Sequence, residues 1–233
     1  MNIENSIYKQ FFLDPTSNDI FEISEIDLSV AADENEWVGL SIIAKIPLEI
    51  SVKLENIIDN SKYIFGDQFY YDKEDLHVTI LEIITCQEKI IIPESEINKY
   101  ISIIDSVISN KNKFILKFCG IIASKSCVVA KGYSIENSIN NIRESLRIAF
   151  KNHQLYNTID NRYVAFASHC TLVRFKNKLE QSSKYSHWMC ELNDFDFGEC
   201  EISELELRIG NWSLTKNKSK CVYRFNLPEQ VNR

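Results

Sequence analysis

Apolar and polar positions along the chain predict two successive series of strands and helices. The first series begins with the β-branched run 37–44, which ends near Pro47. Apolar residues at helical spacing follow over 48–60, and an aromatic stretch covers 65–71. A strand over 76–84 closes this series.

The second series again alternates helices and strands. Pro93 opens an amphipathic helix whose first turn is acidic, a favourable arrangement at a positive helix end. Two apolar runs, 114–123 and 126–130, predict a hairpin, and a helix follows over 134–152. The next predicted strand covers 164–175.

The last part of the chain is shorter and more acidic. A helix is expected over about 178–191, and strands are expected over 204–209 and 221–226. The acidic run 194–204 is interpreted as a solvated edge, because its carboxylates alternate with apolar residues. The alternation of elements predicts an α+β fold in which two pseudo-symmetric lobes, with antiparallel sheets, flank a central cleft.

The pattern also suggests boundaries within the chain. Residues 1–36 are acidic and weakly patterned, and they are expected to form an N-terminal extension that packs on the body. Residues 37–228 would form the bilobal domain, and residues 229–233 a C-terminal tail.

The composition limits which ligands the protein could bind and in which compartment it could function. The chain has 233 residues and a net charge of −7, so it lacks the broad basic surface with which proteins grip long duplex nucleic acid. Seven scattered cysteines without a Cys-x-x-Cys pair favour a reducing compartment rather than a zinc site. Neither a signal peptide nor an 18-residue apolar run is evident, so we expect a cytoplasmic location and no membrane association. We also expect a monomer.

Two copies of one short pattern carry the candidate chemistry. His77-Val-Thr79-Ile-Leu and His169-Cys-Thr171-Leu-Val each combine a histidine, an apolar residue, a threonine and two aliphatic residues. Side chains two apart on a strand point to the same face, so each strand would present an imidazole and a hydroxyl together. The chain has only four histidines, and a chance origin of both copies is improbable.

The paired motifs predict acid–base chemistry at an oxyanion, and phosphate is the natural candidate. One neutral and one protonated imidazole can activate an attacking oxygen and protonate a leaving oxygen. The threonine hydroxyls can donate hydrogen bonds to non-bridging oxygens. The other two histidines, His153 and His187, have no such context and are interpreted as surface or loop residues.

On these residues the chain resembles the 2H phosphoesterase superfamily of RNA 2′,5′-ligase-like and cyclic nucleotide phosphodiesterase proteins. The resemblance covers roughly residues 37–228, including the middle hairpin and the closing pair of strands. One departure is Ser168, where bacterial relatives often have proline. The four motif side chains follow the family pattern.

The resemblance implies a catalytic set of His77, Thr79, His169 and Thr171, with no metal and no cofactor. The implied substrate is a small nucleotide, a cyclic nucleotide or a short oligonucleotide. The implied reaction is cleavage of a 2′,3′-cyclic phosphate or of a 2′,5′-linked or cyclic oligonucleotide.

Four further residues are candidates for substrate binding. Tyr70, Tyr71 and Phe166 could stack on a nucleobase, although a place in the core is the alternative for each aromatic side chain. Arg174 could bind phosphate, but simple alternation from His169 places it on the opposite face. It would need a strand end or a bulge to reach the cleft.

Two other functions compete with the enzyme. The same cleft could bind a nucleotide or a cyclic oligonucleotide without useful turnover. Alternatively, the chain could be an interaction or host–pathogen factor in which the cleft is incidental, a hypothesis that rests only on residues 1–36. The presence of both histidines and both threonines favours the enzyme.

Overall fold

The computed structural model describes residues 8, 19–27, 30, 37–88, 90–180 and 184–229. Much of the predicted N-terminal extension and residues 230–233 of the predicted tail lie outside this part, so the proposed division of the chain stays a prediction.

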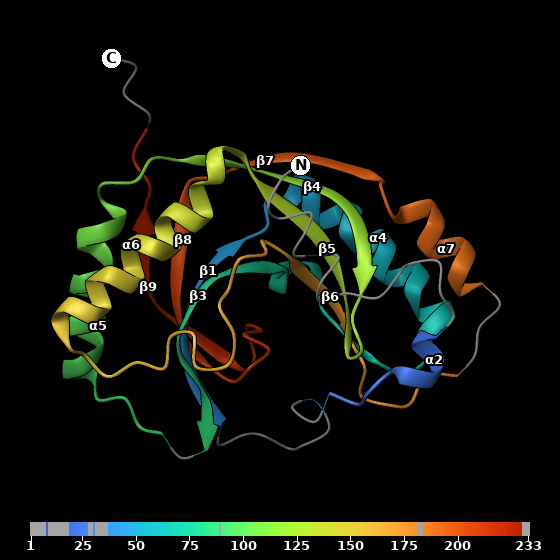
Figure 1. Ribbon diagram of the computed structural model, residues 1–233, viewed down its shortest axis with the longest axis horizontal. Helices are drawn as coiled ribbons and strands as arrows, with labels where there is room; N and C mark the ends of the chain where they lie inside the picture. Colours follow the sequence, from blue (N-terminus) through green and yellow to red (C-terminus); the bar gives the residue numbers. More distant parts are fainter. Residues whose placement is uncertain are drawn as a thin grey trace.

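Within the described residues, nine strands form one curled antiparallel sheet (Figure 1). Every pairing between neighbouring strands is antiparallel. Along the sheet the order is β7 (Asp196–Ile202), β4 (Phe114–Ala123), β5 (Cys127–Ser134), β6 (Cys170–Arg174), β3 (His77–Glu88), β1 (Trp37–Lys45), β8 (Glu204–Gly210) and β9 (Ser219–Asn226), with β2 (Phe69–Tyr70) paired to β6.

The sheet consists of two four-stranded halves that meet at the motif strands. One half is β7-β4-β5-β6 and the other is β3-β1-β8-β9. The halves are joined by a single residue pair, Val78 with Cys170, whereas neighbouring strands inside each half share long ladders. The predicted α+β fold is therefore confirmed, and its two lobes are halves of one sheet.

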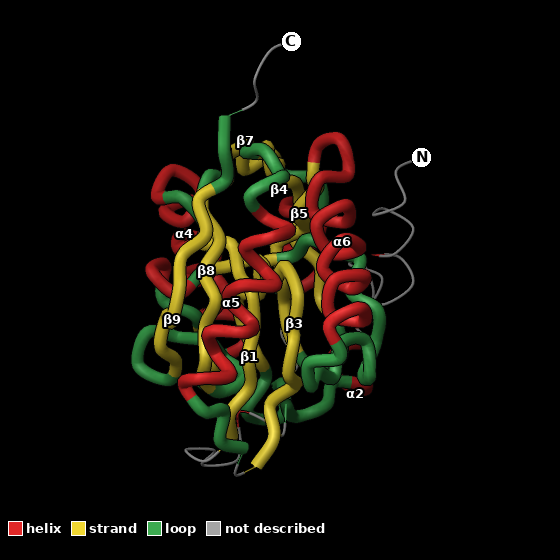
Figure 2. Tube along the Cα trace, turned by 90° about the vertical axis from the view of Figure 1, so that its left-hand side faces the viewer, coloured by secondary structure: helices red, strands yellow, loops and turns green. Residues whose placement is uncertain are grey.

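The longer helices cover the outside of this curled sheet (Figures 1 and 2). Helices α5 (Glu94–Ile108) and α6 (Ser138–His153) pack on the half that contains β3 and β9. Helices α4 (Leu48–Phe65) and α7 (Tyr185–Leu192) pack on the half that contains β4, β6 and β7. Shorter helical segments are α2 (Ile20–Ile23), η1 (Lys73–Asp75) and η2 (Ile135–Asn137).

The helices link the two halves because α4 follows β1 in the chain but covers the other half of the sheet. Likewise α6 follows β5 but packs on β3. One continuous apolar core results, and it includes Leu40, Val78, Phe118 and Leu172, all almost fully buried. Burying each such side chain contributes roughly 1.5–3 kcal/mol, so the motif strands are held in a rigid frame.

The predicted strand over 164–175 begins later than expected. Regular strand starts only at Cys170, and Phe166 is exposed. The carbonyls of Phe166 and Ala167 accept hydrogen bonds from the Arg143 side chain at 2.8 and 2.9 Å. Because these carbonyls bind a side chain, they do not extend the ladder, and the segment before His169 stays irregular.

The acidic run 194–204 contains a strand that the sequence interpretation left out. In β7 the side chains of Phe197, Cys200 and Ile202 are buried, while the carboxylates between them are exposed. The strand lies at the edge of the sheet, so the carboxylates are solvated as expected. The alternation is the half-buried strand pattern.

Two predicted helices also differ in their limits. Helix α6 begins at Ser138 rather than 134, because Glu136 and Asn137 both have a φ of 58°, which interrupts the helical backbone. Helix α7 begins at Tyr185 rather than near 178. The side chain of Leu179, which precedes α7, is buried in the core.

Candidate active site

The pairing of β3 with β6 places the two His-x-Thr motifs side by side. Val78 and Cys170 are Cα partners, and both are fully buried on the helix-covered side. In an antiparallel register the flanking residues also face each other. His77 therefore lies opposite Thr171, and Thr79 lies opposite His169. All four predicted side chains share the other face of the sheet, where each is partly exposed.

This register gives the four groups a nearly two-fold arrangement. Directly opposed side chains on a sheet have Cβ atoms about 4.5–5.5 Å apart, and diagonal neighbours lie roughly 7–8 Å apart. The two imidazoles are diagonal neighbours, as are the two hydroxyls. A tetrahedral phosphate fits between groups at that separation, with one imidazole on each side.

A hydrogen bond defines which nitrogen of His77 carries a proton. Its Nδ1 lies 2.7 Å from the backbone oxygen of Asp75. A carbonyl oxygen only accepts, so Nδ1 is the donor and the lone pair of the neutral ring is on Nε2. The loop is secured in turn, because the buried carboxylate of Asp75 accepts a hydrogen bond from the Lys216 amide at 2.8 Å.

The surroundings of His77 favour its neutral form. Burial is the main cause that lowers its pKa to about 4, and the carbonyl of Asp75 partly opposes this effect. The cations Lys45, Arg174 and Arg208 lower the pKa further. His77 is therefore neutral at pH 7 when no anion is bound.

The surroundings of His169 also favour its neutral form. Burial lowers its pKa to about 4, followed by the charges of Arg143 and Arg174 and by the imidazole of His77. The effect of His77 on His169 is consistent with the diagonal placement of the two rings.

Several cations thus act on the two imidazoles. Lys45 is the Cα partner of His77 on β1, and Arg208 lies on β8, which pairs with the other side of β1. Their positive charge favours an anion near the imidazoles, and it is partly balanced by Asp27, which pairs with Arg174, and by Glu206, which pairs with Arg208. A bound phosphate would also stabilise an imidazolium, so ligand binding is expected to raise the lowered histidine pKa values.

Arg174 reaches this face through a bulge. In the β5–β6 ladder Thr171 pairs with Val129 and Val173 pairs with Val128, which leaves Leu172 as an extra residue. The bulge reverses the alternation, so Arg174 shares the face of Thr171. Its guanidinium binds Asp27 at 2.8 Å.

Aromatic side chains surround Arg174. Its guanidinium carbon lies 5.0 Å from the ring centroid of Trp212, and the Trp212 ring contacts Phe69 edge-on. Tyr71 is buried, contacts the His77 ring edge-on at 6.0 Å between centroids, and has a pKa raised by burial. Tyr71 therefore supports the site from beneath rather than offering a free stacking surface.

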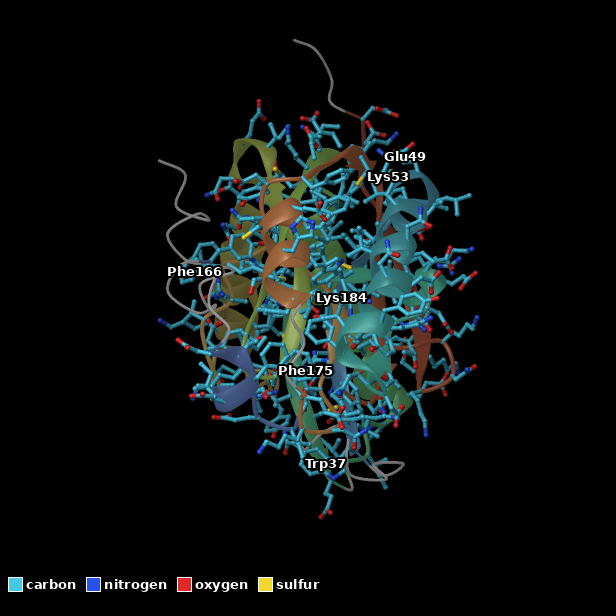
Figure 3. All side chains as sticks on the ribbon, turned by 90° about the vertical axis from the view of Figure 1, so that its right-hand side faces the viewer. Trp37, Glu49, Lys53, Phe166, Phe175 and Lys184 are labelled. Carbon is cyan, nitrogen blue, oxygen red and sulfur yellow. The ribbon has the colours of Figure 1, made fainter. Side chains whose placement is uncertain are left out.

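The contacts of Tyr70 are with α4 and the residue that follows it. The hydroxyl of Tyr70 donates to the carbonyl of Gly66 at 2.6 Å, and Lys62 of α4 lies 5.7 Å from its ring centroid. The side chain of Phe166 is 44% exposed, and Figure 3 shows it at the left margin of the molecule, with Trp37 at the lower end. A stacking role for Phe166 stays a prediction.

The residue pattern contained one signal that sequence analysis missed. Arg143 occupies the apolar side of α6, between Ile139, Ile142 and Leu146, and is only 1% exposed. A charged residue on the apolar side of an amphipathic helix indicates a buried polar contact. Trp212, Lys45 and Arg208 carried no comparable pattern, because they lie near the motifs only in the folded chain.

No group of three or more His, Cys, Asp or Glu side chains in the described part of the chain is arranged to hold a metal ion. None of the helices within the described ranges combines the length and apolar character that crossing a lipid bilayer requires.

Comparison with known proteins identifies the class to which this fold and site belong. A model of the AKAP7 2′5′ RNA ligase-like domain family matches residues 48–223, and the chain belongs to that family within the 2H phosphoesterase superfamily. This membership supports a phosphodiesterase-type activity. A search of curated protein sequences finds no match.

Solved structures share the fold at low sequence identity. The protein TT0787 of Thermus thermophilus superposes with a TM-score of 0.64 at 17% identity, covering 83% of this chain and 100% of that one. LigT of Escherichia coli in complex with 3′-AMP gives a TM-score of 0.57 at 14% identity, with the same coverage. A further phosphoesterase gives 0.52 at 12% identity, covering 82% and 99%.

Proposed function

We propose that this protein is a metal-independent phosphodiesterase that cleaves a 2′,3′-cyclic phosphate or a 2′,5′-linked or cyclic oligonucleotide. The observation that carries the proposal is the antiparallel pairing of Val78 with Cys170, which sets two imidazoles and two hydroxyls on one face. Family membership and the complex of LigT with 3′-AMP, a nucleotide with a 3′-phosphate, support a substrate of this kind.

The reaction requires one proton to enter and one to leave on opposite sides of phosphorus. One imidazole accepts the proton of the attacking hydroxyl, from water or from a neighbouring ribose, as the new P–O bond forms. The other donates a proton to the leaving oxygen as the old P–O bond breaks. Thr79 and Thr171 donate hydrogen bonds to the non-bridging oxygens and stabilise their negative charge.

The asymmetry between the histidines suggests their roles. The Asp75 carbonyl accepts a hydrogen bond from Nδ1 of His77 and so favours the protonated form of that ring. Once a phosphate is bound, we infer that His77 holds the proton and acts as the acid. His169, neutral, then acts as the base, and one turnover moves a proton from His77 to His169.

The net charge of −7 supports a small substrate rather than a long duplex. Binding along a polyanion depends on many basic contacts that release counterions. The cations Lys45, Arg174 and Arg208 instead gather near the imidazoles. Tight, steeply salt-dependent binding to duplex RNA would contradict this substrate class. A cytoplasmic location and a monomeric state stay predictions.

One observation favours a second function, a binding module without useful turnover. Both histidine pKa values lie near 4, so neither imidazole carries an acid proton at pH 7 until an anion binds. If a ligand failed to raise either pKa, the cleft would bind phosphodiesters without cleaving them.

Incubation of the purified protein with a panel of phosphodiesters in excess EDTA, read by mass spectrometry, tests the proposal. Cleavage of a 2′,3′-cyclic or 2′,5′-linked substrate in the presence of chelator is expected. Loss of turnover with chelator and its return with added zinc or manganese would refute the two-histidine mechanism. Binding without cleavage across the whole panel would establish the binding module.

A further inference from the structure

Arg143 of α6 is the largest fully buried side chain among the described residues, with 1% exposure. A guanidinium remains charged at any ordinary pH, and burying an ion is costly unless its hydrogen-bonding groups are satisfied. The contacts of Arg143 therefore indicate why the fold retains it.

The guanidinium has five N–H groups, and five oxygen atoms accept from them. Four of these acceptors are backbone carbonyls and the fifth is a side-chain amide oxygen. The hydrogen bonds run from Nε to Ile80 at 2.7 Å, from Nη1 to Phe166 at 2.8 Å and to the Asn140 amide oxygen at 3.0 Å, and from Nη2 to Thr79 at 3.0 Å and to Ala167 at 2.9 Å.

The four carbonyl acceptors are divided between the two motif segments, and the fifth acceptor, Asn140, lies on α6 itself. Thr79 is itself a motif residue, and Ile80 follows it on β3. Phe166 and Ala167 lie directly before Ser168 and His169 of the second motif. One planar group thus bridges the two segments that carry the histidines.

The bridge lies where the sheet is weakest. Strands β3 and β6 share one residue pair, so the ladder contributes little to their alignment. Beyond that pair the Arg143 fork occupies the position that further backbone hydrogen bonds would take. The rigid geometry of a guanidinium then determines how far apart the segments stand.

We propose that Arg143 is a positioning residue that sets the spacing and orientation of the two His-x-Thr motifs through its four hydrogen bonds to their backbone carbonyls. The proposal rests on the proposed function for its catalytic consequence. The structural part of the proposal, that buried Arg143 sets the positions of the two imidazoles, does not depend on the proposed function.

Charge and shape make separate contributions at this position, and substitutions separate them. Lysine keeps the charge but has three N–H groups on one nitrogen, so it cannot bridge four carbonyls in a plane. Glutamine removes the charge as well. The charge of Arg143 lowers the pKa of His169, so its removal is expected to raise that pKa.

Arg147, one turn further along α6, provides a matched control. It also ties the helix to a loop, binding Asp160 at 2.6 and 3.0 Å and the carbonyl of Ala165 at 3.3 Å. Both partners precede the second motif segment in the chain, and neither lies on β3. Arg147→Lys and Arg147→Gln therefore test the loss of a helix-to-loop arginine contact without the bridge.

The experiment compares Arg143→Lys, Arg143→Gln and the two Arg147 variants by steady-state kinetics and by NMR titration of the histidine rings. Arg143→Lys should lower kcat by about 10²-fold with a smaller change in KM, the scale of a misplacement near 1 Å. The pKa of His169 should change little in Arg143→Lys and rise in Arg143→Gln. Both Arg147 variants should retain kcat within about threefold and unchanged histidine titrations, as distant independent sites do.

A variant with a smaller perturbation covers the case in which Arg143 variants fail to fold. Asn140→Ala removes, at a partly exposed position, the acceptor on α6 that holds Nη1 of Arg143, so it loosens the guanidinium without removing the bridge. It should shift the ring resonances of both histidines and lower kcat, whereas Arg147→Lys should do neither. Unchanged resonances and kcat in Asn140→Ala would overturn the proposal, as would a folded Arg143→Lys protein with wild-type kcat and histidine titrations.

The NMR readout separates this proposal from the proposed function. A wild-type protein that cleaves no phosphodiester would refute the enzyme, but the histidine resonances of the variants would still show whether Arg143 positions the rings. Conversely, an active wild type whose Arg143 variants behave like the Arg147 variants would refute only the positioning role.

Discussion

Val78 and Cys170 form the one residue pair through which the two halves of the sheet meet. Each is the middle residue of a His-x-Thr motif, and both are fully buried. The point of contact between the halves is therefore also the centre of the candidate active site. A change in how the halves meet would alter the separation of the imidazoles directly.

Removal of either imidazole is expected to disable catalysis. His77→Ala and His169→Ala should each lower kcat by at least about 10²-fold, because each removes one proton transfer. The double variant should be little worse than either single variant, because the two groups act as a unit. Steady-state kinetics with circular dichroism measures both effects. His153→Ala, a change at an exposed residue of α6, serves as the control. A well-folded, nearly fully active single variant would exclude that histidine from the mechanism.

Removal of either threonine hydroxyl should be milder. Thr79→Val and Thr171→Val each remove one hydrogen bond to a charged oxygen, a loss of about 1.5–3 kcal/mol, so we expect kcat to fall by roughly ten- to a hundredfold. Proton transfer remains intact, and the pH at which kcat is highest should not move. Thr85→Val, on the same strand but bonded to Glu82 and Thr158, is the matched control. If Thr79→Val and Thr171→Val had the same kcat as the control Thr85→Val, the hydroxyls of Thr79 and Thr171 would have no role in catalysis.

Phosphate binding should reverse the lowered histidine pKa values. Both lie near 4 in the free protein, and an anion between the rings stabilises the imidazolium. NMR titration with and without inorganic phosphate or 3′-AMP should show the pKa of His77 rising. The pH profile of kcat reports pKa values in the enzyme–substrate complex, and that of kcat/KM reports those of the free enzyme. The bell-shaped profile of kcat should therefore lie at higher pH than that of kcat/KM. Identical profiles, with no ligand effect on either ring, would contradict the proposed acid–base pair.

The histidines should also make the fold less stable in acid. Their folded pKa values lie below the ordinary 6.5, so the unfolded chain binds more protons between pH 6.5 and 4. Stability is then complete above about pH 6.5 and falls as the pH is lowered, by roughly 1.4 kcal/mol per pH unit for each histidine. Urea unfolding at several pH values measures this slope. Parallel stability curves for wild type and His169→Ala would show that burial does not lower the pKa of His169.

The local sequence pattern was sufficient to predict several features of the protein. Period-2 and period-3.6 spacing located most strands and helices, and the repeated His-x-Thr pattern identified four side chains that share one face. These features depend on neighbours within a few residues, which the sequence displays directly. The edge strand β7 could have been predicted as well, from its alternation of Phe197, Cys200 and Ile202 with carboxylates.

Only the tertiary structure decided how these parts meet. The bulge at Leu172, which turns Arg174 to the face of Thr171, depends on the register of β6 against β5. The late start of β6 depends on Arg143, which comes from a helix and binds the carbonyls of Phe166 and Ala167. Contacts between residues distant in sequence arise from packing and from the need to satisfy buried polar groups, and no local spacing encodes them. The sequence by itself therefore determined which groups could perform the chemistry, and the fold decided their separation, their protonation and the cations around them.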